Sequence, residues 1–473
     1  MTQTTGYGNK NTQWSLRPGE QVHFVGIGGI GLSGVARILL QKGYSVSGSD
    51  LRLSHITREL VQLGATVYEG HRPENIGKAS LVVASSAIPG QNPELAEART
   101  RNIQVVKRGQ LLAWLMKDRY GIAVAGTHGK TTTSAMMALT LENANLDPTI
   151  IVGGIVPEIG SNAKDGEGQY LVIEADEYDR TFLDLNPQAA VITSIEMDHP
   201  DCFADLEDMS EAFCGFLAKI PADGFVMASG DDPEVRRVIA SLGEVKVSTY
   251  GLGERVDWKA MDLQQNTLGG NDFRVVEDGK EKGDFQLSIP GIHNVSNALA
   301  VIGMADYLGL DLACARDTLR HFQGVLRRFQ VKGEVNGMTV VDDYAHHPSE
   351  IRATLAGARR RYGGRRIWAI FQPHTYSRTK ALLAEFAAAF DEADRVIVTA
   401  IFAAREQDDL GISANDLVEM MTHPEAVHIA DLSEASARVS KKLEPGDVLI
   451  TMGAGDVWRA GEEVLASLKQ RAE

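Results

Sequence analysis

The feature that most constrains the fold is a short glycine-containing segment between an apolar run and a helix-compatible run. Residues Gly121–Ala125 are apolar and predict a buried strand, and residues Thr131–Asn143 favour a helix. Two glycines and a lysine separate these runs. A strand, a glycine-rich turn and a helix N-terminus together predict a phosphate-binding loop, because the turn N–H groups and the helix dipole both attract an anion. The alternative is an ordinary strand-to-helix turn.

The side chains of this loop suit a nucleoside triphosphate. Lys130 supplies a mobile positive charge for the β- and γ-phosphates, and the hydroxyl of Thr131 is placed to ligate Mg2+. Val124 stands where the general phosphate-loop pattern has a glycine. The predicted ATP-binding residues of the loop are Gly126, Thr127, His128, Gly129, Lys130, Thr131 and Thr132.

The run Gly126–Thr133 resembles the nucleotide loop of the Mur ligase family, whose shortened loop accounts for Val124. Members of that family build peptidoglycan precursors by ATP-driven amide-bond formation. The resemblance continues in order along the chain at His23–Gly31, Glu174–Glu177, Asp198–His199, His293–Asn294, Arg327–Phe329, Asp342–Tyr344 and Phe371–His374. The sequence departs from the family pattern at Tyr178, Arg180, Ala345 and Thr375.

The length of the chain points to several cores. A chain of 473 residues predicts about three domains, and contents of 44% hydrophobic and 23% charged residues are typical of globular proteins. The family resemblance implies a UDP-sugar-binding domain at 1–119, an ATP-binding domain at 120–331 and a domain that binds the amino acid and closes on ATP at 332–473. Alternating strands and helices predict an α/β fold, Rossmann-like at both ends with a P-loop-type sheet between.

Charge and composition limit the partners of the chain. The formal net charge of −16 argues against a nucleic-acid-binding surface. The polar start of the chain lacks the apolar core of a signal peptide, and no apolar run is long enough to span a bilayer. We expect a cytoplasmic monomer or homodimer that acts on small molecules, with no membrane insertion and with a loose tail before Gln21.

A second glycine loop lies near the N-terminus. Val22–Val25 predicts a strand, the segment Gly26–Gly31 follows, and Ser45–Ser49 predicts the next strand, which ends at Asp50. This spacing is typical of a nucleotide-binding turn, in which glycines let a diphosphate approach the backbone and the acid binds a ribose hydroxyl. The residues leave NAD and a UDP-sugar open as ligands, and a bare turn is the remaining alternative.

Ligands of a doubly wound sheet lie at the carboxyl ends of its strands. Ser85 and Arg108 follow the predicted strands Leu81–Ala84 and Val105–Val106, and His71 also falls near such an end. Each of these three side chains, taken alone, is more often a surface polar residue. The predicted UDP-sugar-binding residues are Gly28, Gly29, Ile30, Gly31, Asp50, His71, Ser85 and Arg108.

Two acidic clusters follow predicted strands of the central region. Glu174–Glu177 comes after Tyr170–Ile173, and Glu196–His199 comes after Ala189–Ser194. In a parallel sheet both clusters share the edge of the nucleotide loop, where carboxylates suit Mg2+, although an N-cap or a solvated loop is the alternative. The predicted metal ligands are Thr131, Glu174 and His199, and the predicted catalytic residues are Lys130, Glu174 and His199. The histidine rests partly on the family resemblance, because imidazole prefers softer ions.

Residues 257–288 are polar and alternating, and they predict a ribbon of strands without a function of its own. A predicted helix follows and runs to about Leu308. Asn294 and Asn297 share one face of it, where two amides could hold a purine base or a phosphate, or cap the helix. The family resemblance assigns Asn294, Asn297, Arg328 and Asp343 to nucleotide binding.

The C-terminal region again alternates strands with helices. Its predicted strands are Thr339–Asp342, Arg366–Phe371, Arg395–Val398 and Val448–Thr451. His374 and Arg378 follow the second of these strands, and an arginine there can hold the carboxylate of an amino acid through two hydrogen bonds. The alternative is a surface arginine at a helix start.

The resemblance implies an ATP-dependent amide ligase. In such a reaction ATP phosphorylates the carboxylate of UDP-N-acetylmuramate to an acyl phosphate, and the amine of L-alanine displaces the phosphate. No protein nucleophile is needed, so we expect catalysis by positioning and charge neutralisation. Three alternatives stay open. They are a murein-recycling ligase that adds a tripeptide, an NAD-dependent dehydrogenase that leaves the Lys130 loop unexplained, and a nucleotide-gated binding module.

Overall fold

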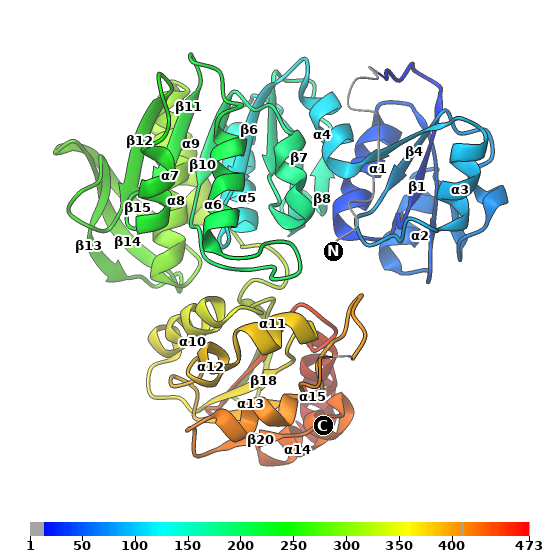
Figure 1. Ribbon diagram of the computed structural model, residues 1–473. Coiled ribbons are helices and arrows are strands. Elements are labelled where there is room, and N and C mark those ends of the chain that lie inside the picture. Colours follow the sequence, from blue (N-terminus) through cyan, green and yellow to red (C-terminus); the bar gives the residue numbers. More distant parts are fainter. Residues whose placement is uncertain (1–13, 409, 473) are drawn as a thin grey trace. The chain divides into compact units, whose positions relative to one another are not determined.

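The computed structural model describes residues 14–408 and 410–472 (Figure 1). Most of the expected N-terminal tail falls on residues 1–13 and lies outside the described residues. The chain forms two compact units. The first comprises the chain through Ile195, Ser210–Tyr250 and Ala300–Ala315, and the second comprises Glu196–Met209, Gly251–Leu299 and the chain from Arg316. Both units draw on the predicted central domain, and the predicted domain boundaries stay predictions.

The first unit begins with a parallel sheet of strand order β3-β2-β1-β4-β5. Its strands are β1 (Gln21–Val25), β2 (Ser45–Asp50), β3 (Thr66–Glu69), β4 (Leu81–Ala84) and β5 (Gln104–Lys107). Its helices are α1 (Ile30–Gln41), α2 (His55–Gln62), η1 (Pro73–Ile76), α3 (Pro93–Thr100) and α4 (Arg108–Met116). Val25 packs with Leu95 and Ala98 of α3, while Phe24 points to the opposite face because side chains alternate along a strand. The order confirms the predicted doubly wound sheet.

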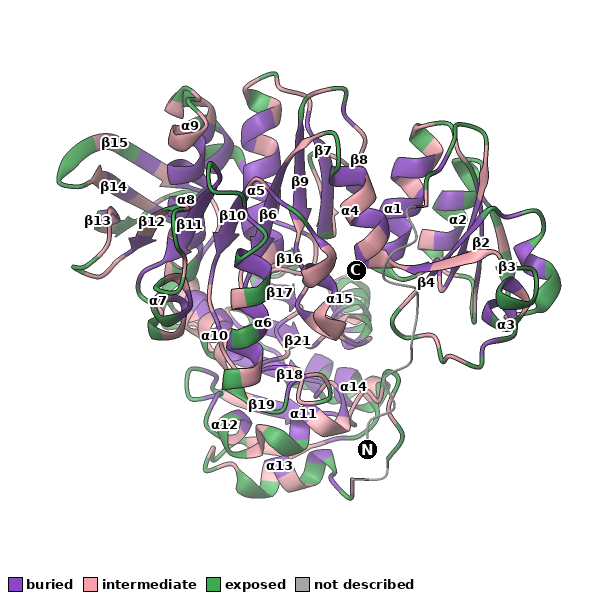
Figure 2. Ribbon diagram, turned by 45° about the horizontal axis from the view of Figure 1, so that its top comes forward, coloured by how far each residue is buried: buried purple, intermediate pink, exposed green. Residues whose placement is uncertain are grey.

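The first unit also contains neighbouring strands in the order β12-β11-β10-β6-β9-β7-β8. They are β6 (Tyr120–Ala125), β7 (Thr149–Val156), β8 (Ser161–Lys164), β9 (Tyr170–Glu174), β10 (Ala189–Ile192), β11 (Phe225–Ser229) and β12 (Lys246–Gly251). The accompanying helices are α5 (Lys130–Asn143), η2 (Tyr178–Asp184), α6 (Leu206–Leu217) and α7 (Pro233–Ile239). Figure 2 shows that β6, β9, β10 and β11 are buried along most of their length. Such burial is typical of parallel strands covered on both faces.

The second unit contains the predicted ribbon. Its strands β13 (Trp258–Gln265), β14 (Asn271–Glu277) and β15 (Lys280–Leu287) pair antiparallel in sequence order. The helices that follow are α8 (Ile292–Tyr307) and α9 (Leu312–His321). Burial alternates along the first four residues of β13 and along β14 from Asn271 to Val275, so one face of the ribbon is covered there and the other is more exposed.

The C-terminal sheet has the strand order β16-β17-β21-β18-β19-β20. Its strands are β16 (Gln330–Val335), β17 (Met338–Asp343), β18 (Ile367–Phe371), β19 (Arg395–Val398), β20 (Ala426–His428) and β21 (Val448–Met452). Its helices are α10 (Pro348–Tyr362), α11 (Tyr376–Ala381), α12 (Leu383–Ala387), α13 (Ala414–Met420), α14 (Leu432–Lys442) and α15 (Trp458–Ala472). Only the edge strand β16 runs antiparallel to its neighbour among the described strands of this sheet.

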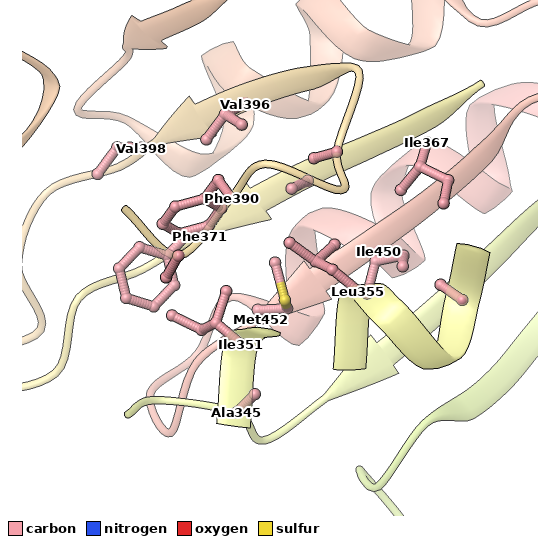
Figure 3. Packing of buried hydrophobic residues seen from close by; sticks show 14 of the residues in the cluster. Ala345, Ile351, Leu355, Ile367, Phe371, Phe390, Val396, Val398, Ile450 and Met452 are labelled. Atoms are coloured by element: carbon pink, nitrogen blue, oxygen red, sulfur yellow. The ribbon is translucent and has the colours of Figure 1, made fainter. Parts of the chain in front are cut away.

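Both faces of the C-terminal sheet are packed. Ile367 and Phe371 of β18 join Ile351 and Leu355 of α10 in one apolar cluster (Figure 3). Trp368 lies in a second cluster with residues of α14 and α15, because its side chain leaves the strand on the other face. With both faces covered, polar side chains of this sheet gather at the strand ends.

The described elements differ from the predicted ones mainly at loops and short strands. Helix α1 begins at Ile30 rather than Leu32, and α5 begins at Lys130 rather than Thr131. The sequence did not predict β7 and β8, whose pairing is irregular between Ile151 and Val156. None of the helices within residues 14–408 and 410–472 combines the length and the apolar character that a bilayer crossing requires.

Candidate functional site

The nucleotide loop joins β6 to α5. Gly126 and Gly129 have φ values of 133° and 81°, which glycine adopts without strain. A Cβ atom at Gly126 would overlap the hydroxyl of Thr193 and the backbone of Ser194. The carbonyl of Ser194 also accepts a hydrogen bond from the Thr127 N–H at 2.8 Å. The segment after β10 therefore holds the loop in one conformation.

Lys130 is the first residue of α5 and folds back over the loop. Its Nζ donates to the carbonyls of Gly126 at 2.6 Å and Thr127 at 3.1 Å, and to Oε1 of Glu177 at 2.9 Å. Burial lowers the pKa of Lys130, but Glu177 and the neighbouring strand-end carboxylates raise it above its ordinary value overall. The loop therefore keeps a cation at the helix N-terminus, which suits the phosphate-binding role predicted for it.

Two predicted metal ligands lie in the first unit. Glu174 ends β9 and is in register with Val124 of the neighbouring β6, and its Oε2 accepts from the Gly153 N–H at 2.7 Å. Thr131 is buried in the first turn of α5. A hydroxyl and a carboxylate are oxygen donors, which fit Mg2+. His199 belongs to the second unit, so the three-ligand set stays a prediction.

The N-terminal glycine loop joins β1 to α1. Asp50 ends β2, and its Oδ2 accepts a hydrogen bond from the Gly28 N–H at 2.9 Å. The carbonyl of Ser49 accepts from the N–H groups of Gly26 at 2.8 Å and Ile27 at 3.0 Å. A Cβ atom at Gly28 would lie 2.9 Å from the Asp50 carboxylate, so glycine permits the close approach. The predicted ribose-binding acid thus lies against the loop.

Arg108 begins α4 and reaches two of the predicted sites. Its guanidinium lies so close to Gly31 that a Cβ atom there would overlap it. Its NH2 group donates to Oδ2 of Asp176 at 2.7 Å, and the preceding Lys107 pairs with Asp179 at 2.6 Å. The structure therefore brings a predicted UDP-sugar residue beside the acidic cluster that follows β9.

Ser85 and His71 occupy strand ends of the same N-terminal sheet. The Ser85 N–H donates to the Val25 carbonyl at 3.1 Å. Nδ1 of His71 is 2.9 Å from Oγ of Ser49 and 3.4 Å from Oε2 of Glu94. Glu94 is fully buried on α3. Sequence analysis missed it because a single glutamate in a helix belongs to no motif.

The second unit brings together four polar side chains from distant positions. Nε of Arg378 donates to Oδ1 of Asp198 at 2.8 Å. The two terminal nitrogens of the guanidinium lie 3.1 Å from Nδ1 of His374 and 3.4 Å from Nδ1 of His199. Arg378 is only 3% exposed, so the alternative of a surface arginine is wrong.

The charges of this cluster are set by burial and by Arg378. Burial raises the pKa of Asp198, but the guanidinium of Arg378 outweighs burial and holds the pKa well below its ordinary value. Burial lowers the pKa of His374 to about 2 and that of His346 to about 4. The rings of His346 and His374 are 5.8 Å apart. Arg378 therefore lies near one carboxylate and the neutral imidazoles of His374 and His346, and His346 is a member that sequence analysis missed.

The two predicted amides lie at the start of α8. Nδ2 of Asn294 donates to the Pro290 carbonyl at 2.6 Å, and Nδ2 of Asn297 donates to Oδ1 of Asn294 at 3.1 Å. Both side chains are buried. These contacts differ from an N-cap, in which a side-chain oxygen accepts from a backbone N–H of the first turn. Nucleotide binding by this pair stays a prediction.

Arg328 and Asp343 both lie at the entrance to the C-terminal sheet. Asp343 accepts from the N–H groups of Phe329 at 2.8 Å and Ala345 at 2.7 Å. Burial raises the pKa of the Asp343 carboxyl to about 6, against the opposing charge of Arg328. Arg328 itself lies 3.4 Å from Oε1 of Glu350. The role of both residues in nucleotide binding stays a prediction.

Two doubly wound sheets and a lysine-bearing phosphate loop define an α/β nucleotide-binding protein. The sequence matches three family descriptions, "Mur ligase family, catalytic domain" at residues 21–120, "Mur ligase middle domain" at 124–305 and "Mur ligase, glutamate ligase domain" at 327–455. The chain belongs to the Mur ligase family and has its three-domain α/β fold. The predicted resemblance is thereby confirmed.

Named relatives span nearly the whole chain. A UDP-N-acetylmuramate–L-alanine ligase of Caldanaerobacter subterraneus subsp. tengcongensis is 43% identical over 454 residues, covering 95% of this chain and 98% of the relative. The crystal structure of a UDP-N-acetylmuramate–alanine ligase from Thermotoga maritima is 30% identical with a TM-score of 0.82, covering 95% and 99% of the two chains. A murein peptide ligase from Psychrobacter arcticus shares the fold, at 24% identity and a TM-score of 0.73 over 95% and 99%.

Proposed function

We propose that this protein is an ATP-dependent ligase that joins the carboxylate of UDP-N-acetylmuramate to the amine of L-alanine. The observation that carries the proposal is the position of Lys130, a buried cation at the N-terminus of α5 beside the acidic end of β9. The names of full-length relatives at 43% identity support the two substrates. The same loop in an NAD-dependent dehydrogenase would have no role.

The reaction has two transfers and needs no protein nucleophile. The γ-phosphoryl group of ATP moves to a carboxylate oxygen of the muramoyl group, and ADP leaves. The amine of L-alanine then attacks the acyl carbon, loses a proton, and the phosphate leaves with the former carboxylate oxygen. Lys130 neutralises negative charge on the transferring group, which is the main way a protein accelerates such a step.

Thr131 and Glu174 supply the oxygen atoms that would hold Mg2+, and we assign His199 as the third side chain of this set. When bound, Mg2+ neutralises phosphate charge as a Lewis acid. The chain's own contribution is to orient the reactants. The loop of Gly28, Gly29, Ile30 and Gly31 takes the diphosphate of the UDP-sugar, and Asp50 takes its ribose.

Arg378 is the residue that we assign to the amino-acid carboxylate. Its Nε is bonded to Asp198, whereas its terminal nitrogens lie beside the neutral ring of His374 and beside Nδ1 of His199. A guanidinium beside a neutral imidazole can bind a second carboxylate, and paired hydrogen bonds to one favour a small zwitterionic amino acid. His374 orients the guanidinium from the other side.

A measurement of ADP release tests the proposal. UDP-N-acetylmuramate is supplied together with L-alanine, glycine, L-serine or a tripeptide in turn. We expect ADP release to require both the UDP-sugar and a small amino acid. ATP hydrolysis that needs neither substrate would favour a nucleotide-gated binding module. A preference for the tripeptide would favour the murein-recycling ligase over the biosynthetic one. Saturable NAD(H) binding would overturn the assignment of the Gly26–Gly31 loop.

An arginine variant tests the acceptor site separately. Arg378→Ala should raise the KM for L-alanine roughly ten- to a hundred-fold, because hydrogen bonds to a charged group contribute about 1.5–3 kcal/mol. The KM for ATP should stay unchanged. Arg405, which pairs with Asp201 at 2.9 Å nearer the surface, provides the matched control in Arg405→Ala. An unchanged KM for L-alanine in Arg378→Ala would remove this residue from the site.

A further inference from the structure

A buried carboxylate lies behind the strand ends that we assign to the UDP-sugar. Glu94 is fully buried, and four donors surround its two oxygens. Oε1 accepts from Nδ2 of Asn75 at 2.6 Å and from the Arg72 N–H at 3.2 Å. Oε2 is 2.5 Å from Oγ of Ser49 and 3.4 Å from Nε2 of His23. Neither the glycine loop nor the proposed reaction uses this network.

The ionised state of Glu94 fixes the direction of every hydrogen bond around it. Burial raises the pKa of the carboxyl, but hydrogen bonds from His23, Ser49 and Asn75 lower it to about 2 overall. A carboxylate only accepts hydrogen bonds, so the hydroxyl proton of Ser49 points at Glu94. The oxygen of Ser49 is then left with lone pairs for its second neighbour, Nδ1 of His71 at 2.9 Å.

The direction of the Ser49 hydroxyl also determines which ring nitrogen of His71 carries the proton. Because Ser49 already donates to Glu94, the contact with His71 requires a proton on Nδ1. A deprotonated Nδ1 would also place a lone pair 3.4 Å from Oε2 of Glu94. A neutral imidazole with a proton on Nδ1 presents a lone pair on Nε2. Among the described residues, the recorded polar contacts of the His71 ring are all made by Nδ1.

His71 stands where a nucleotide would meet it. The side chain is 11% exposed and follows β3, whose neighbour β2 ends in Ser49 and Asp50. The carbonyl of Ser49 anchors the turn at Gly26, while its hydroxyl orients His71. Ser49 thus links the turn at Gly26 to the ring of His71, and the Gly70 N–H, next to His71, donates to the carbonyl of Asp50 at 2.7 Å.

We propose that Glu94, acting through Ser49, holds His71 with its proton on Nδ1, so that Nε2 accepts a hydrogen bond from the N3–H of uracil and the site rejects cytosine. The proposal rests on the proposed function, which places UDP at this sheet edge. Uracil carries a proton on N3, whereas cytosine carries a lone pair at the same atom. A fixed acceptor therefore matches one base and opposes the other. Glu94 and Ser49 are positioning residues, and His71 is the residue that contacts the base.

Reversing the chain of hydrogen bonds provides a direct test. In Glu94→Gln the Arg72 N–H, which can only donate, keeps the amide oxygen at the Oε1 position and turns the amide nitrogen toward Ser49. Ser49 then accepts from Gln and donates to His71, which moves the ring proton to Nε2. The binding of UDP and CDP to the full-length protein is measured by calorimetry near pH 8.5.

We expect the wild type to favour UDP over CDP by roughly ten- to a hundred-fold, the cost of one opposed hydrogen bond. The ratio should fall at least about tenfold in Glu94→Gln. Ser49→Ala, which removes the relay with a small change in volume, should bring the ratio toward one. Glu97, which pairs with Arg101 on the exposed side of α3, provides the control, and Glu97→Gln should keep the wild-type ratio.

Nitrogen-15 spectra of the histidine rings, with the His71 signal identified by its loss in His71→Gln, report the tautomer itself. The proton should lie on Nδ1 in the wild type and on Nε2 in Glu94→Gln. A wild-type proton on Nε2, or equal losses of UDP and CDP affinity in Ser49→Ala, would overturn the inference while leaving the UDP site in place. A wild-type protein that binds neither nucleotide would overturn the proposed UDP site and the inference with it.

Discussion

Two glycine-rich loops of the first unit share one plan and differ in charge. Each leaves a central strand, β1 or β6, and each enters a helix preceded by a glycine, Gly29 or Gly129. The first loop is closed by the carboxylate of Asp50 on a backbone N–H, and the second by Lys130 on backbone carbonyls. Helix N-termini attract phosphate in both cases. We therefore infer that the added side chain suits the first loop to a ribose hydroxyl and the second loop to a phosphoryl group in transfer, as the proposed function requires.

Replacing Lys130 should have the largest effect, because it should impair the second loop and leave the first loop intact. Lys130→Ala should lower kcat for ligation roughly a thousand-fold, because it removes a buried cation from the developing charge. The affinity for UDP-N-acetylmuramate, measured by calorimetry, should stay unchanged because that ligand uses the other loop. Lys164→Ala is the matched control, since Lys164 pairs with Glu142 and Asp147 on the surface of the same unit. Equal losses of sugar-nucleotide affinity and activity would contradict the separation.

A fall in pH should have the next largest effect. The buried charge near the first loop is the carboxylate of Glu94, whereas the buried charge of the second loop is the cation of Lys130. The pKa of Glu94 is lowered from 4.5 to about 2. A lowered pKa stabilises the folded state fully above the unfolded value, and this stabilisation, about 3 kcal/mol, is lost as the pH falls from about 4.5 toward about 2. The difference in Tm between wild type and Glu94→Gln should therefore shrink between about pH 5 and pH 3. A constant difference would show that the ionised carboxylate does not stabilise the fold.

Alanine substitutions in the two loops should sharpen the comparison. Gly126 has a φ of 133° and no room for a Cβ atom, so Gly126→Ala should destabilise the protein by about 2 kcal/mol and weaken ATP binding. Gly29 has a φ of −68°, and the nearest atom to an added Cβ is 3.5 Å away. Gly29→Ala should change stability by less than about 0.5 kcal/mol. Chemical unfolding of both variants checks the contrast, and similar losses would contradict it.

Asp50 should give the smallest effect. Asp50→Asn weakens a charged acceptor at the Gly28 N–H, so the affinity for UDP-N-acetylmuramate should fall about tenfold while the KM for ATP stays constant. Glu69→Gln at the exposed end of β3 is the control carboxylate. Unchanged UDP-sugar affinity in Asp50→Asn would show that Asp50 does not contribute to binding the nucleotide.

The alternation of strands and helices was predictable because its signals are local. Both glycine loops and the C-terminal sheet follow from apolar runs bounded by glycine or polar turns, and the β13–β15 ribbon follows from the alternation along residues 257–288. Strands β7 and β8 were missed because Gly153 and Gly154 interrupt the apolar run and the pairing is irregular there. The order of strands across a sheet follows from topology rather than from any single segment.

The residues of the candidate sites also fall into two groups, those that a local motif reveals and those that only the fold brings together. Lys130 and Thr131 were found because the loop motif places them beside the glycines that they serve. The pairing of Asp198 with Arg378 joins positions 180 residues apart, and no local pattern signals it. Glu94 likewise gains its importance only from the strand-end side chains of Ser49 and His71. Contacts of this kind need the fold before they can be recognised.

The position of Arg108 has a consequence for exchanging parts between relatives. Its guanidinium leaves no room for a side chain at Gly31 and is bonded to Asp176. We therefore expect a side chain at residue 31, or a change of charge at 108 or 176, to require a compensating change at another of these positions. A chimera joined between residues 119 and 120 inherits the first two from one parent and the third from the other. We expect this contact to persist in hybrids whose parents both carry glycine at 31 and the same charges at 108 and 176.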